Sequence, residues 1–290
     1  MIVMVLGASG MLGSALYRHL GRSKDIKIIG TLRDKVFAKQ LGESRNKQLW
    51  IEPNITEAAH LDDILARARP DMVINSIGVV KQLSSAQDPL VTLPVNAVFP
   101  HQLQHCCQNR NIRLIHISTD CVFSGSKGNY SETDTPDPVD LYGHSKLLGE
   151  VTGPNTITFR TSFIGHEMGG GHSLLEWFLA QKQATNGFTK VFFSGLPTVE
   201  LAHIIENFVL PDTKLHGLYH LSAEPISKYE LLNLVGNIYE KEVKLHPMDS
   251  PQIDRSLDSA RFKTATGYVP PSWPDLIKKM RAAQLDVTAP

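Results

Sequence analysis

Tyr142 and Lys146 stand four positions apart in the segment "LYGHSKLLGE" (141–150), soon after the turn formers "TPDP" (135–138). If a helix begins here, residues i and i+4 share one face, so a phenol and an ammonium lie side by side. A free phenol has a pKa of about 10, and a nearby ammonium lowers that pKa by favouring the phenolate. The pair is therefore predicted to protonate a carbonyl oxygen while hydride reaches its carbon. The same spacing also occurs by chance on exposed helices, so the prediction depends on the neighbouring motifs.

A glycine-rich motif, "GASGMLG" (7–13), follows the first apolar run and precedes a helical pattern. Gly7 permits a tight turn, Gly10 a close approach of the backbone to a pyrophosphate, and Gly13 close packing of helix on strand. The N–H groups at the start of the following helix favour an anion. A plain strand-to-helix turn would also use glycines, but the position at the start of an alternating series favours a dinucleotide site.

The end of the second apolar run, "GTLRDK" (30–35), bears on which dinucleotide binds. Enzymes that use NAD often place an acidic residue here to bond the ribose 2′-hydroxyl. Arg33 could instead face a 2′-phosphate, although Asp34 follows directly and Arg33 could also be a solvated surface residue. We expect NADP(H) to be preferred, with NAD(H) as the alternative.

Polar residues at the ends of two further apolar runs complete the predicted site. "HISTDCVFSG" (116–125) ends a strand, and the carboxyl ends of strands in such sheets face the ligand crevice. Thr119 is placed to donate a hydrogen bond to a substrate carbonyl oxygen as negative charge develops on it, and Asp120 to orient its neighbours. Asn75 and Ser76 are expected to line the side of the nicotinamide ribose. The alternative is that Thr119 and Asp120 merely end a strand.

The elements that must position these residues alternate along the first half of the chain. Short runs rich in Val and Ile cover 2–7, 26–32, 48–51, 71–77, 113–119 and 156–162, with helical patterns at 11–22, 58–69, 93–110 and 142–152. This alternation predicts an α/β fold with a Rossmann-type, doubly wound parallel sheet.

After residue 165 the pattern changes and predicts a smaller C-terminal α/β substrate lobe. We expect helices near 173–183, 198–210, 227–241 and 272–284, and strands near 190–195 and 217–222. The NAD(P)-binding domain is predicted over 1–165, with returning segments near 188–222, and the substrate lobe mainly over 166–290. The glycine-rich segment 165–173 is either a mobile flap over a ligand or a simple turn.

Composition excludes several classes of function. The 290 residues are 42% hydrophobic and 20% charged, which is ordinary for a globular protein, and Lys+Arg and Asp+Glu both number 29. Zero net charge argues against a nucleic-acid partner, and no apolar run is long enough for a membrane span. Three cysteines without a signal peptide indicate a reducing, cytoplasmic compartment. His101 and His105 form an i, i+4 pair, but no third ligand is evident, so we expect no metal.

Together with "VINSIG", "VNAVFP" and "FRTSFIG", these motifs resemble the extended short-chain dehydrogenase/reductase superfamily over nearly the whole chain, and within it the dTDP-4-dehydrorhamnose reductase group. The resemblance implies a catalytic set of Thr119, Tyr142 and Lys146, with NADPH or NADH as the hydride donor. It also implies a sugar-nucleotide substrate. The cofactor contacts that it implies, beside those of the glycines, Tyr142 and Lys146, come from Ser9, Met11, Leu12, Asn54 and Ile55.

The departures from the family pattern lie mostly on the substrate side. Cys121 stands where an aromatic residue often follows Ser-Thr-Asp, and Phe163 stands where a tryptophan is common. Near the adenine, Asn54 replaces a usual aspartate. A nucleotide-linked 4-keto-6-deoxy sugar other than the rhamnose precursor, or another keto sugar, therefore fits equally well. The expected substrate contacts are Lys81, Thr119, Asp120, Cys121, Arg160 and Phe163.

Two of the expected substrate contacts are cations. The sequence leaves open the role of these cations, the class of function and the oligomeric state. Lys81 and Arg160 could meet a diphosphate or could be surface or salt-bridge residues. A sugar-nucleotide epimerase or dehydratase is an alternative, but a dehydratase normally has an Asp-Glu pair where Asp120 is followed by Cys121. A non-catalytic, cofactor-binding regulatory subunit is a second alternative, which the intact catalytic set argues against. The chain could also form a homodimer.

Overall fold

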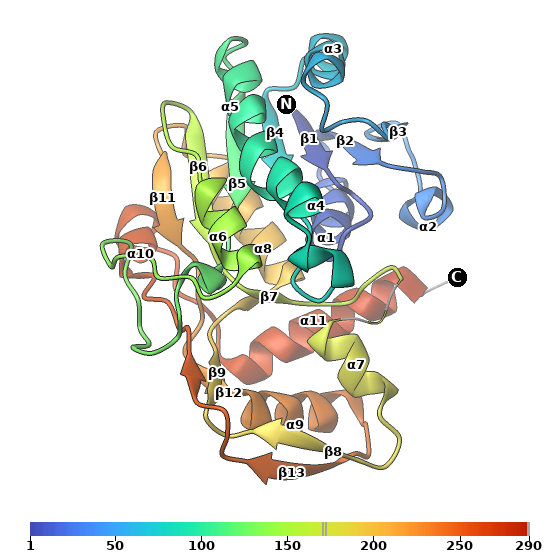
Figure 1. Cartoon of the computed structure of the whole chain (residues 1–290). Helices are drawn as coiled ribbons and strands as arrows, with labels where there is room; N and C mark the ends of the chain where they lie inside the picture. Colours follow the sequence, from blue (N-terminus) through green and yellow to red (C-terminus); the bar gives the residue numbers. More distant parts are fainter. Residues whose placement is uncertain (170, 172, 289–290) are drawn as a thin grey trace.

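A parallel sheet forms the centre of the molecule in the computed structural model, which describes residues 1–169, 171 and 173–288. Within this part of the chain the sheet has seven strands in the order β3-β2-β1-β4-β5-β6-β11, and every neighbouring pair is parallel (Figure 1). The predicted doubly wound α/β fold is confirmed. The strands are β1 (Ile2–Leu6), β2 (Lys27–Leu32), β3 (Lys47–Ile51), β4 (Met72–Asn75), β5 (Arg113–Ile117), β6 (Thr156–Arg160) and β11 (Gly217–His220).

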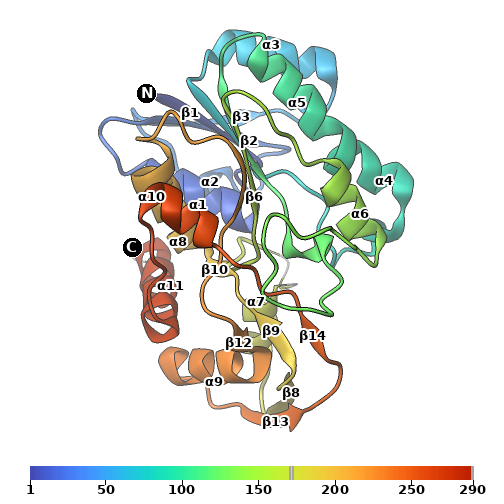
Figure 2. The same cartoon turned by 90° about the vertical axis from the view of Figure 1, so that its left-hand side faces the viewer.

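Helices cover both faces of this sheet, which is why its strands are apolar at nearly every position. Along β1, Val3 and Val5 pack into the cluster on the α1 side, whereas Met4 and Leu6 pack into the cluster on the α3 side. Figure 2 shows the two layers. One layer contains α1 (Met11–Leu20) and α8 (Thr198–Ile204), and the other contains α3 (Ala58–Ala68), α5 (Phe99–Gln108) and α6 (Leu141–Leu148).

The helix expected at 93–110 is longer and less regular than its pattern predicts. It begins as α4 (Pro89–Leu93), where the Asp88 carboxylate accepts a hydrogen bond of 2.8 Å from the Leu90 N–H. It continues through a π-helical turn, η2 (Pro94–Val98), into α5. Pro94 lacks the N–H that an unbroken α-helix would need at this point, so the change of winding falls where the sequence cannot supply the bond.

The C-terminal lobe consists of small sheets and helices beside the strand ends. β9 (Val191–Phe193) lies between β12 (Ile226–Ser227) and β14 (Ile253–Asp254), and β10 (Leu196–Pro197) pairs with β7 (Phe163–Ile164). A separate pair joins β8 (Ala184–Phe188) to β13 (Lys244–Met248). The remaining elements are α2 (Ala38–Leu41), η1 (Ser84–Gln87), η3 (Asp120–Val122), α7 (Leu174–Ala180), η4 (Ile205–Val209), α9 (Lys228–Tyr239), α10 (Ala260–Thr266) and α11 (Trp273–Thr288).

The chain crosses between the two lobes more than once. After β10 it returns to the sheet, where α8 packs against α1 and β11 adds the edge strand beside β6. The predicted 165–173 flap includes Gly170 and His172, which lie outside the described residues. Its described part comes close to Phe37, because a side chain at Gly169 would meet the Phe37 ring at 2.8 Å. This part of the segment therefore lies beside the loop that follows β2.

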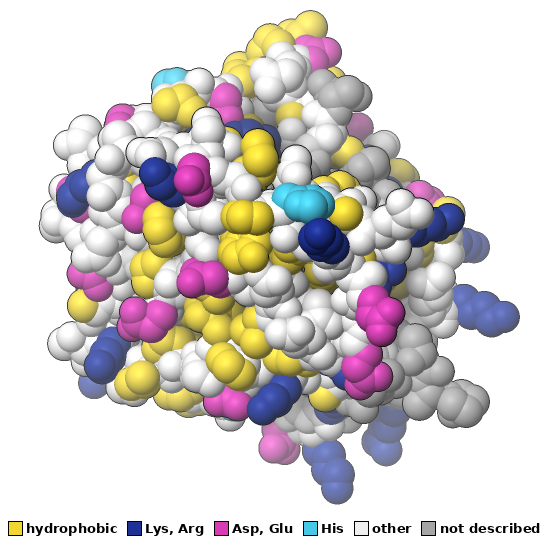
Figure 3. Space-filling view, turned by 90° about the horizontal axis from the view of Figure 1, so that it is seen from below, with side chains coloured by type: hydrophobic (Ala, Val, Ile, Leu, Met, Phe, Trp, Pro, Cys, Tyr) yellow, Lys and Arg dark blue, Asp and Glu magenta, His cyan; other side chains and the backbone are white. Residues whose placement is uncertain are grey.

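The lower face of the molecule carries side chains of both charges. In Figure 3, hydrophobic side chains occupy the middle of this face, with basic and acidic side chains interspersed around them. The exposed apolar residues of this lobe include Trp177, Phe192 and Met248. This face therefore does not present the single-sign surface that a nucleic acid would need. Among the described helices, none combines the length and apolarity needed to cross a membrane.

Candidate active site

The glycine-rich motif forms a tight loop between β1 and α1. Gly7 has a φ of +82°, and the Gly10 N–H donates a hydrogen bond of 3.0 Å to the Gly7 carbonyl. A side chain at Gly13 would lie 2.1 Å from that same carbonyl oxygen, so only glycine fits there. No side chain caps α1 at Gly10, so the first N–H groups of the helix remain suited to an anionic ligand. The loop has the form that a dinucleotide pyrophosphate requires.

Two polar residues lie at the end of β4, and Ser76 braces the glycine-rich loop. The Ser76 hydroxyl donates to the Leu6 carbonyl at 2.5 Å. Asn75 is buried, and its side chain binds the His116 Nδ1 at 3.2 Å and accepts from the Ile77 N–H at 3.1 Å. Both residues lie at the predicted strand end. The polar atoms of Asn75 are engaged with protein groups, which argues against its predicted direct contact with a ribose.

The loop after β2 favours the predicted 2′-phosphate contact. The Asp34 carboxylate accepts a hydrogen bond of 2.9 Å from the Val36 N–H, so it shapes its own loop. Arg33 is exposed beside it. After β3, Asn54 is exposed, but the Ile55 side chain is buried in the core on the α3 side, so only its backbone could reach a ligand.

Tyr142 lies against the end of β5, in the first turn of α6. The Asp140 carboxylate caps this helix by accepting from the Gly143 N–H at 2.8 Å. Burial raises the pKa of the Tyr142 phenol, and the neighbouring Cys121 raises it further, whereas a hydrogen bond with Thr119 lowers it. The structure therefore brings Thr119, Cys121 and Tyr142 together, and the phenol keeps its proton at neutral pH.

Lys146 reaches the end of β5 from the same helix face as Tyr142. Its ammonium donates a hydrogen bond of 2.6 Å to the Ile117 carbonyl, at the end of β5. Burial lowers its pKa to about 8, and the Glu150 carboxylate opposes this effect. The lowering of the Tyr142 pKa by this ammonium stays a prediction, because the hydrogen bond of Lys146 goes to the strand. The helix places both residues on one face, but the lysine reaches the strand while the phenol reaches Thr119.

Close backbone contacts dock α6 in place. A side chain at Gly149 would lie 1.9 Å from the Asn96 carbonyl oxygen, and one at Gly143 would lie 2.3 Å from the Cys121 carbonyl oxygen. The side-chain amide of Asn96 donates from Nδ2 to the Ser145 hydroxyl at 3.1 Å, and its Oδ1 accepts from the Val79 N–H at 2.8 Å. Asn96 therefore ties α6 to the segment that follows β4.

The predicted substrate cations have different surroundings. Arg160 is only 4% exposed, and its Nε and Nη2 both bind the Glu150 carboxylate at 2.8 Å, with Phe123 stacked against the guanidinium. This buried pair is internal to the fold, so the predicted contact of Arg160 with a substrate is not supported. Lys81 forms an ion pair of 2.6 Å with Asp140 at the start of α6 and is partly exposed. Phe163 is half-buried on β7.

Two further cations near Cys121 were missed by sequence reasoning. Lys228, from α9, lies within electrostatic reach of Asp120 and Cys121. Arg255, which follows β14, donates from its Nε to the Phe123 carbonyl at 2.8 Å. Its charge also acts to lower the pKa of the Cys121 thiol. Both belong to the C-terminal lobe, where no local pattern connects them to the β5 loop, so only the tertiary fold could reveal them.

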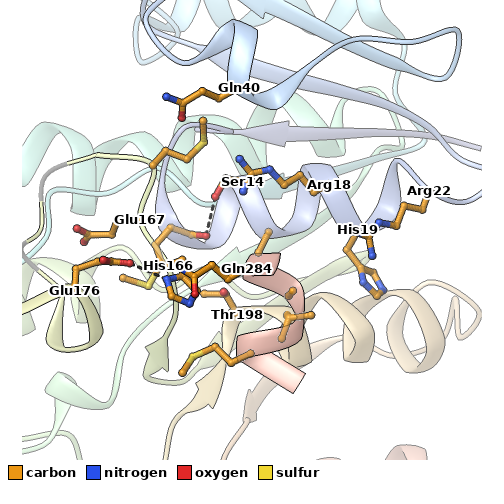
Figure 4. Close-up of a pocket in the computed structure, with 16 residues that line it drawn as sticks. Ser14, Arg18, His19, Arg22, Gln40, His166, Glu167, Glu176, Thr198 and Gln284 are labelled. Carbon is orange, nitrogen blue, oxygen red and sulfur yellow. Dashed lines mark hydrogen bonds and ion pairs between the residues drawn. The ribbon is translucent and has the colours of Figure 1, made fainter. Parts of the chain in front are cut away.

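A separate cavity of about 290 Å³ lies between α1, α11 and the segment 165–168 (Figure 4). Its lining mixes Arg18 with Glu167 and Glu176, and the His166 imidazole binds the Glu176 carboxylate at 2.8 Å. Thr119, Tyr142 and Lys146 are not among its lining residues. Since both charges line it, the cavity selects no single class of ligand.

This strand order, the glycine-rich loop before α1 and the Thr119/Tyr142/Lys146 set at the strand ends define the extended short-chain dehydrogenase/reductase class. A family model described as the RmlD substrate binding domain matches residues 1–284, and the chain belongs to that family.

Individual relatives resemble the chain over most of its length. The dTDP-4-dehydrorhamnose reductase of Aggregatibacter actinomycetemcomitans is 26% identical over 97% of this chain and 98% of the relative. The probable low-salt glycan biosynthesis reductase Agl14 of Haloferax volcanii is 28% identical over 77% of this chain and 75% of the relative. The crystal structure of the Bacillus anthracis dTDP-4-dehydrorhamnose reductase in complex with NADP has a TM-score of 0.79 at 20% identity, covering 97% and 99% of the two chains.

Proposed function

We propose that this chain is an NAD(P)H-dependent oxidoreductase that reduces a nucleotide-linked keto sugar, of the 4-keto-6-deoxy class, in deoxysugar or polysaccharide biosynthesis. The observation that carries the proposal is the placement of the glycine-rich loop and the Thr119/Tyr142 contact at the carboxyl ends of β1 and β5, on one edge of one sheet. The relatives named as dTDP-4-dehydrorhamnose reductases support the choice of substrate class.

In the proposed mechanism, NAD(P)H, when bound, would be the source of the hydride that reaches the keto carbon. Tyr142 donates its phenolic proton to the keto oxygen, which becomes a hydroxyl group. Because burial raises the pKa of this phenol, the phenol carries its proton at neutral pH, as an acid in the reduction must. The Thr119 hydroxyl, which at present donates to the Asp120 carboxylate at 3.1 Å, turns to the developing oxyanion. Lys146, whose ammonium reaches the end of β5 from α6, would hold the cofactor ribose.

The cofactor preference follows from the loop after β2. Arg33 is available to a 2′-phosphate, while Asp34 is engaged with its own loop and does not present an acid to a 2′-hydroxyl. NADP(H) is therefore preferred, with NAD(H) as an alternative. The complex of the Bacillus anthracis reductase with NADP supports this preference.

The proposal extends to organisation and compartment. Residues 1–165, with the returning segments near 188–222, bind the cofactor, and residues 166–290 mainly bind the nucleotide sugar. Leu90 on α4, Val98 on η2 and Leu148 on α6 form an exposed apolar strip, which supports a homodimer. Cys106 and Cys107 are adjacent, buried and not joined in a disulfide, which supports a reducing, cytoplasmic setting.

Tyr142→Phe tests the proposed chemistry. The variant removes the proton donor and keeps the ring, so kcat for reduction of 4-keto nucleotide sugars is expected to fall about 10²- to 10⁴-fold. NADPH affinity is expected to be retained. Turnover is followed by NADPH oxidation, and affinity by fluorescence titration. Tyr219→Phe is the matched control, because Tyr219 is a buried tyrosine on β11 outside the site, and it should keep wild-type turnover.

Other outcomes would identify the alternatives. Undiminished turnover in Tyr142→Phe would rule out the phenol as the acid. Isomerisation of the sugar without net NADPH oxidation would indicate an epimerase. Cofactor binding without turnover of any sugar, together with a co-purifying enzyme, would indicate a regulatory subunit.

A further inference from the structure

Cations from both lobes gather around the loop that follows the proposed catalytic threonine. Lys81, Lys228 and Arg255 all act electrostatically on one another or on Cys121. Lys81 comes from the segment after β4, whereas Lys228 and Arg255 come from the C-terminal lobe. The cluster therefore spans the junction between the two lobes, next to the atoms that the proposed reaction uses.

Lys228 is a partly buried ammonium without a bonded partner. It is the first residue of α9, where Ser227 and Glu230 satisfy each other in a capping box, so that carboxylate is already used. The Lys228 ammonium forms neither a hydrogen bond nor an ion pair with a described residue. Burial and the nearby Arg255 and Lys81 lower its pKa, while Asp120 and Cys121 raise it. A desolvated charge of this kind is costly unless an anion compensates it.

Arg255 is anchored but keeps donors to spare. Its Nε donates to the Phe123 carbonyl at 2.8 Å, which fixes the side chain against the turn η3. Its two terminal nitrogens have no hydrogen-bonded or ion-paired partner among the described residues. A guanidinium held in this way presents a fixed pair of donors, which suits the oxygens of a phosphate.

The acids that face the cluster do not cancel it. Asp140 is paired with Lys81 at 2.6 Å and also caps α6. Asp120 accepts from the Thr119 hydroxyl at 3.1 Å and is not ion-paired with a described residue. Asp137 accepts from the Ser124 N–H at 2.8 Å. Lys228 and Arg255 thus remain the cations that are not closely paired at this side of the site.

We propose that Lys228 and Arg255, with Lys81 at the rim, bind the diphosphate of the nucleotide-linked sugar. The inference rests on the proposed function, and it assigns to the C-terminal lobe the role that the sequence suggested for Arg160. Asp120 and Cys121 directly follow Thr119 in the chain and lie near both Tyr142 and Lys228. The cation cluster is therefore close to Thr119 and Tyr142. A diphosphate held here would therefore leave the attached sugar beside the proton donor.

Lys228→Met tests the inference, because it keeps the length of the side chain and removes its charge. The affinity for dTDP, measured by calorimetry, is expected to fall about ten- to hundredfold, the range of a lost hydrogen bond to a charged group. KM for the nucleotide sugar should rise by a similar factor, with a smaller change in kcat. Affinities for thymidine and NADPH should not change, since neither meets this cluster.

Lys244→Met is the matched control, because Lys244 is an exposed lysine of the same lobe on β13. It should bind dTDP as the wild type does. Lys228→Arg should recover much of the dTDP affinity, which a purely structural role would not predict. Thermal melting of each variant checks the fold, and Arg255→Gln provides a second test if Lys228→Met proves unstable.

The outcomes separate this inference from the proposed function. If the wild type reduces keto nucleotide sugars but Lys228→Met and Arg255→Gln keep wild-type dTDP affinity and KM, the diphosphate site is wrong and the function stands. If the variants lose NADPH affinity together with dTDP affinity, the cluster does not belong to the substrate. If the wild type binds neither dTDP nor UDP and oxidises NADPH with no keto nucleotide sugar, both the function and this site are overturned.

Discussion

Lys146 shows how a functional residue can oppose the stability of its own fold. Its ammonium is buried and, among the described residues, is hydrogen-bonded only to the Ile117 carbonyl of β5, and burial lowers its pKa from 10.5 to about 8. A group with such a depressed pKa is charged at neutral pH in a place that favours its neutral form. The proposed ribose contact requires that charge, so the site carries a cost in stability.

Lys146→Met is expected to stabilise the protein while abolishing activity. The fall in pKa from 10.5 to about 8 corresponds to roughly 3 kcal/mol at neutral pH. Between about pH 8 and 10.5 the unfolded chain keeps a proton that the folded chain releases, so wild-type stability rises with pH there. The gain from the variant should therefore be largest below pH 8 and shrink toward pH 10. Urea unfolding at several pH values measures it.

An exposed lysine provides the comparison. Lys244→Met removes an exposed charge and should change the free energy of unfolding by no more than about 0.5 kcal/mol at any of these pH values. A destabilised Lys146→Met variant at neutral pH would show that the buried ammonium contributes more through its hydrogen bond than it costs by desolvation.

At the residue scale, the sequence predicts which residues form the site better than it predicts which groups their side chains bond. Thr119, Cys121 and Tyr142 do come together, because strand ends and helix starts meet at one edge of a parallel sheet. Arg160 resembles a substrate cation in the sequence, yet Glu150 neutralises it in the interior. The partner of a charged side chain depends on tertiary packing, and the same limit concealed Lys228 and Arg255.

At the element scale, the position of α6 depends on glycines more than on apolar contacts. Gly143 and Gly149 let the helix backbone touch the Cys121 and Asn96 carbonyls directly. Tyr142 lies next to the first contact and Lys146 lies between the two, so the docking fixes where both side chains point. A sequence pattern shows the glycines but not the backbone that they approach.

Gly149→Ala should displace this helix. Its new methyl group would lie 1.9 Å from the Asn96 carbonyl oxygen, and backbone on both sides leaves no flexible group to yield. We expect a loss of about 1–3 kcal/mol in the free energy of unfolding, together with reduced turnover because Tyr142 and Lys146 shift. Denaturant unfolding and steady-state kinetics measure the two effects.

Gly236→Ala is the matched control on α9. There the added methyl group would make ordinary contacts at 3.5 Å, so the higher helix propensity of alanine should stabilise the protein by about 0.5–1 kcal/mol. Equal effects of the two substitutions would show that α6 does not depend on this close approach.

The accuracy of element prediction follows the strength of each pattern. Apart from the half-buried edge strand β3, the sheet strands from β1 to β6 are buried on both faces or nearly so, and their apolar runs predict them within a few residues. β8 and β13 were not predicted, because "ATNGF" and "KLHPM" contain glycine or proline and lie largely exposed. Without a buried face there is no periodic apolar signal to read.

At the scale of the whole molecule, an apolar strip remains uncovered on the helical layer that carries α6. Leu90 on α4 is 84% exposed, Val98 on η2 is 50% exposed, and Leu148 on α6 is 62% exposed. These elements adjoin, since α4 and η2 both pack against α6 and Gly149 lies against Asn96. Exposed apolar residues that gather on adjoining helices mark an interaction surface.

A second copy of the chain fits this strip in the way that the proposed homodimer requires. A twofold contact is self-complementary, so two such helical layers can pack face to face and cover each other's apolar side chains. Val98→Glu combined with Leu148→Glu would place charges in that contact and should convert a dimer into a monomer, measured by light scattering after gel filtration. Val269→Glu alters an apolar residue that is 59% exposed on a different element and should leave the dimer intact. A monomeric wild type at micromolar concentration, or a dimer that survives the double substitution, would show that the strip does not join two chains.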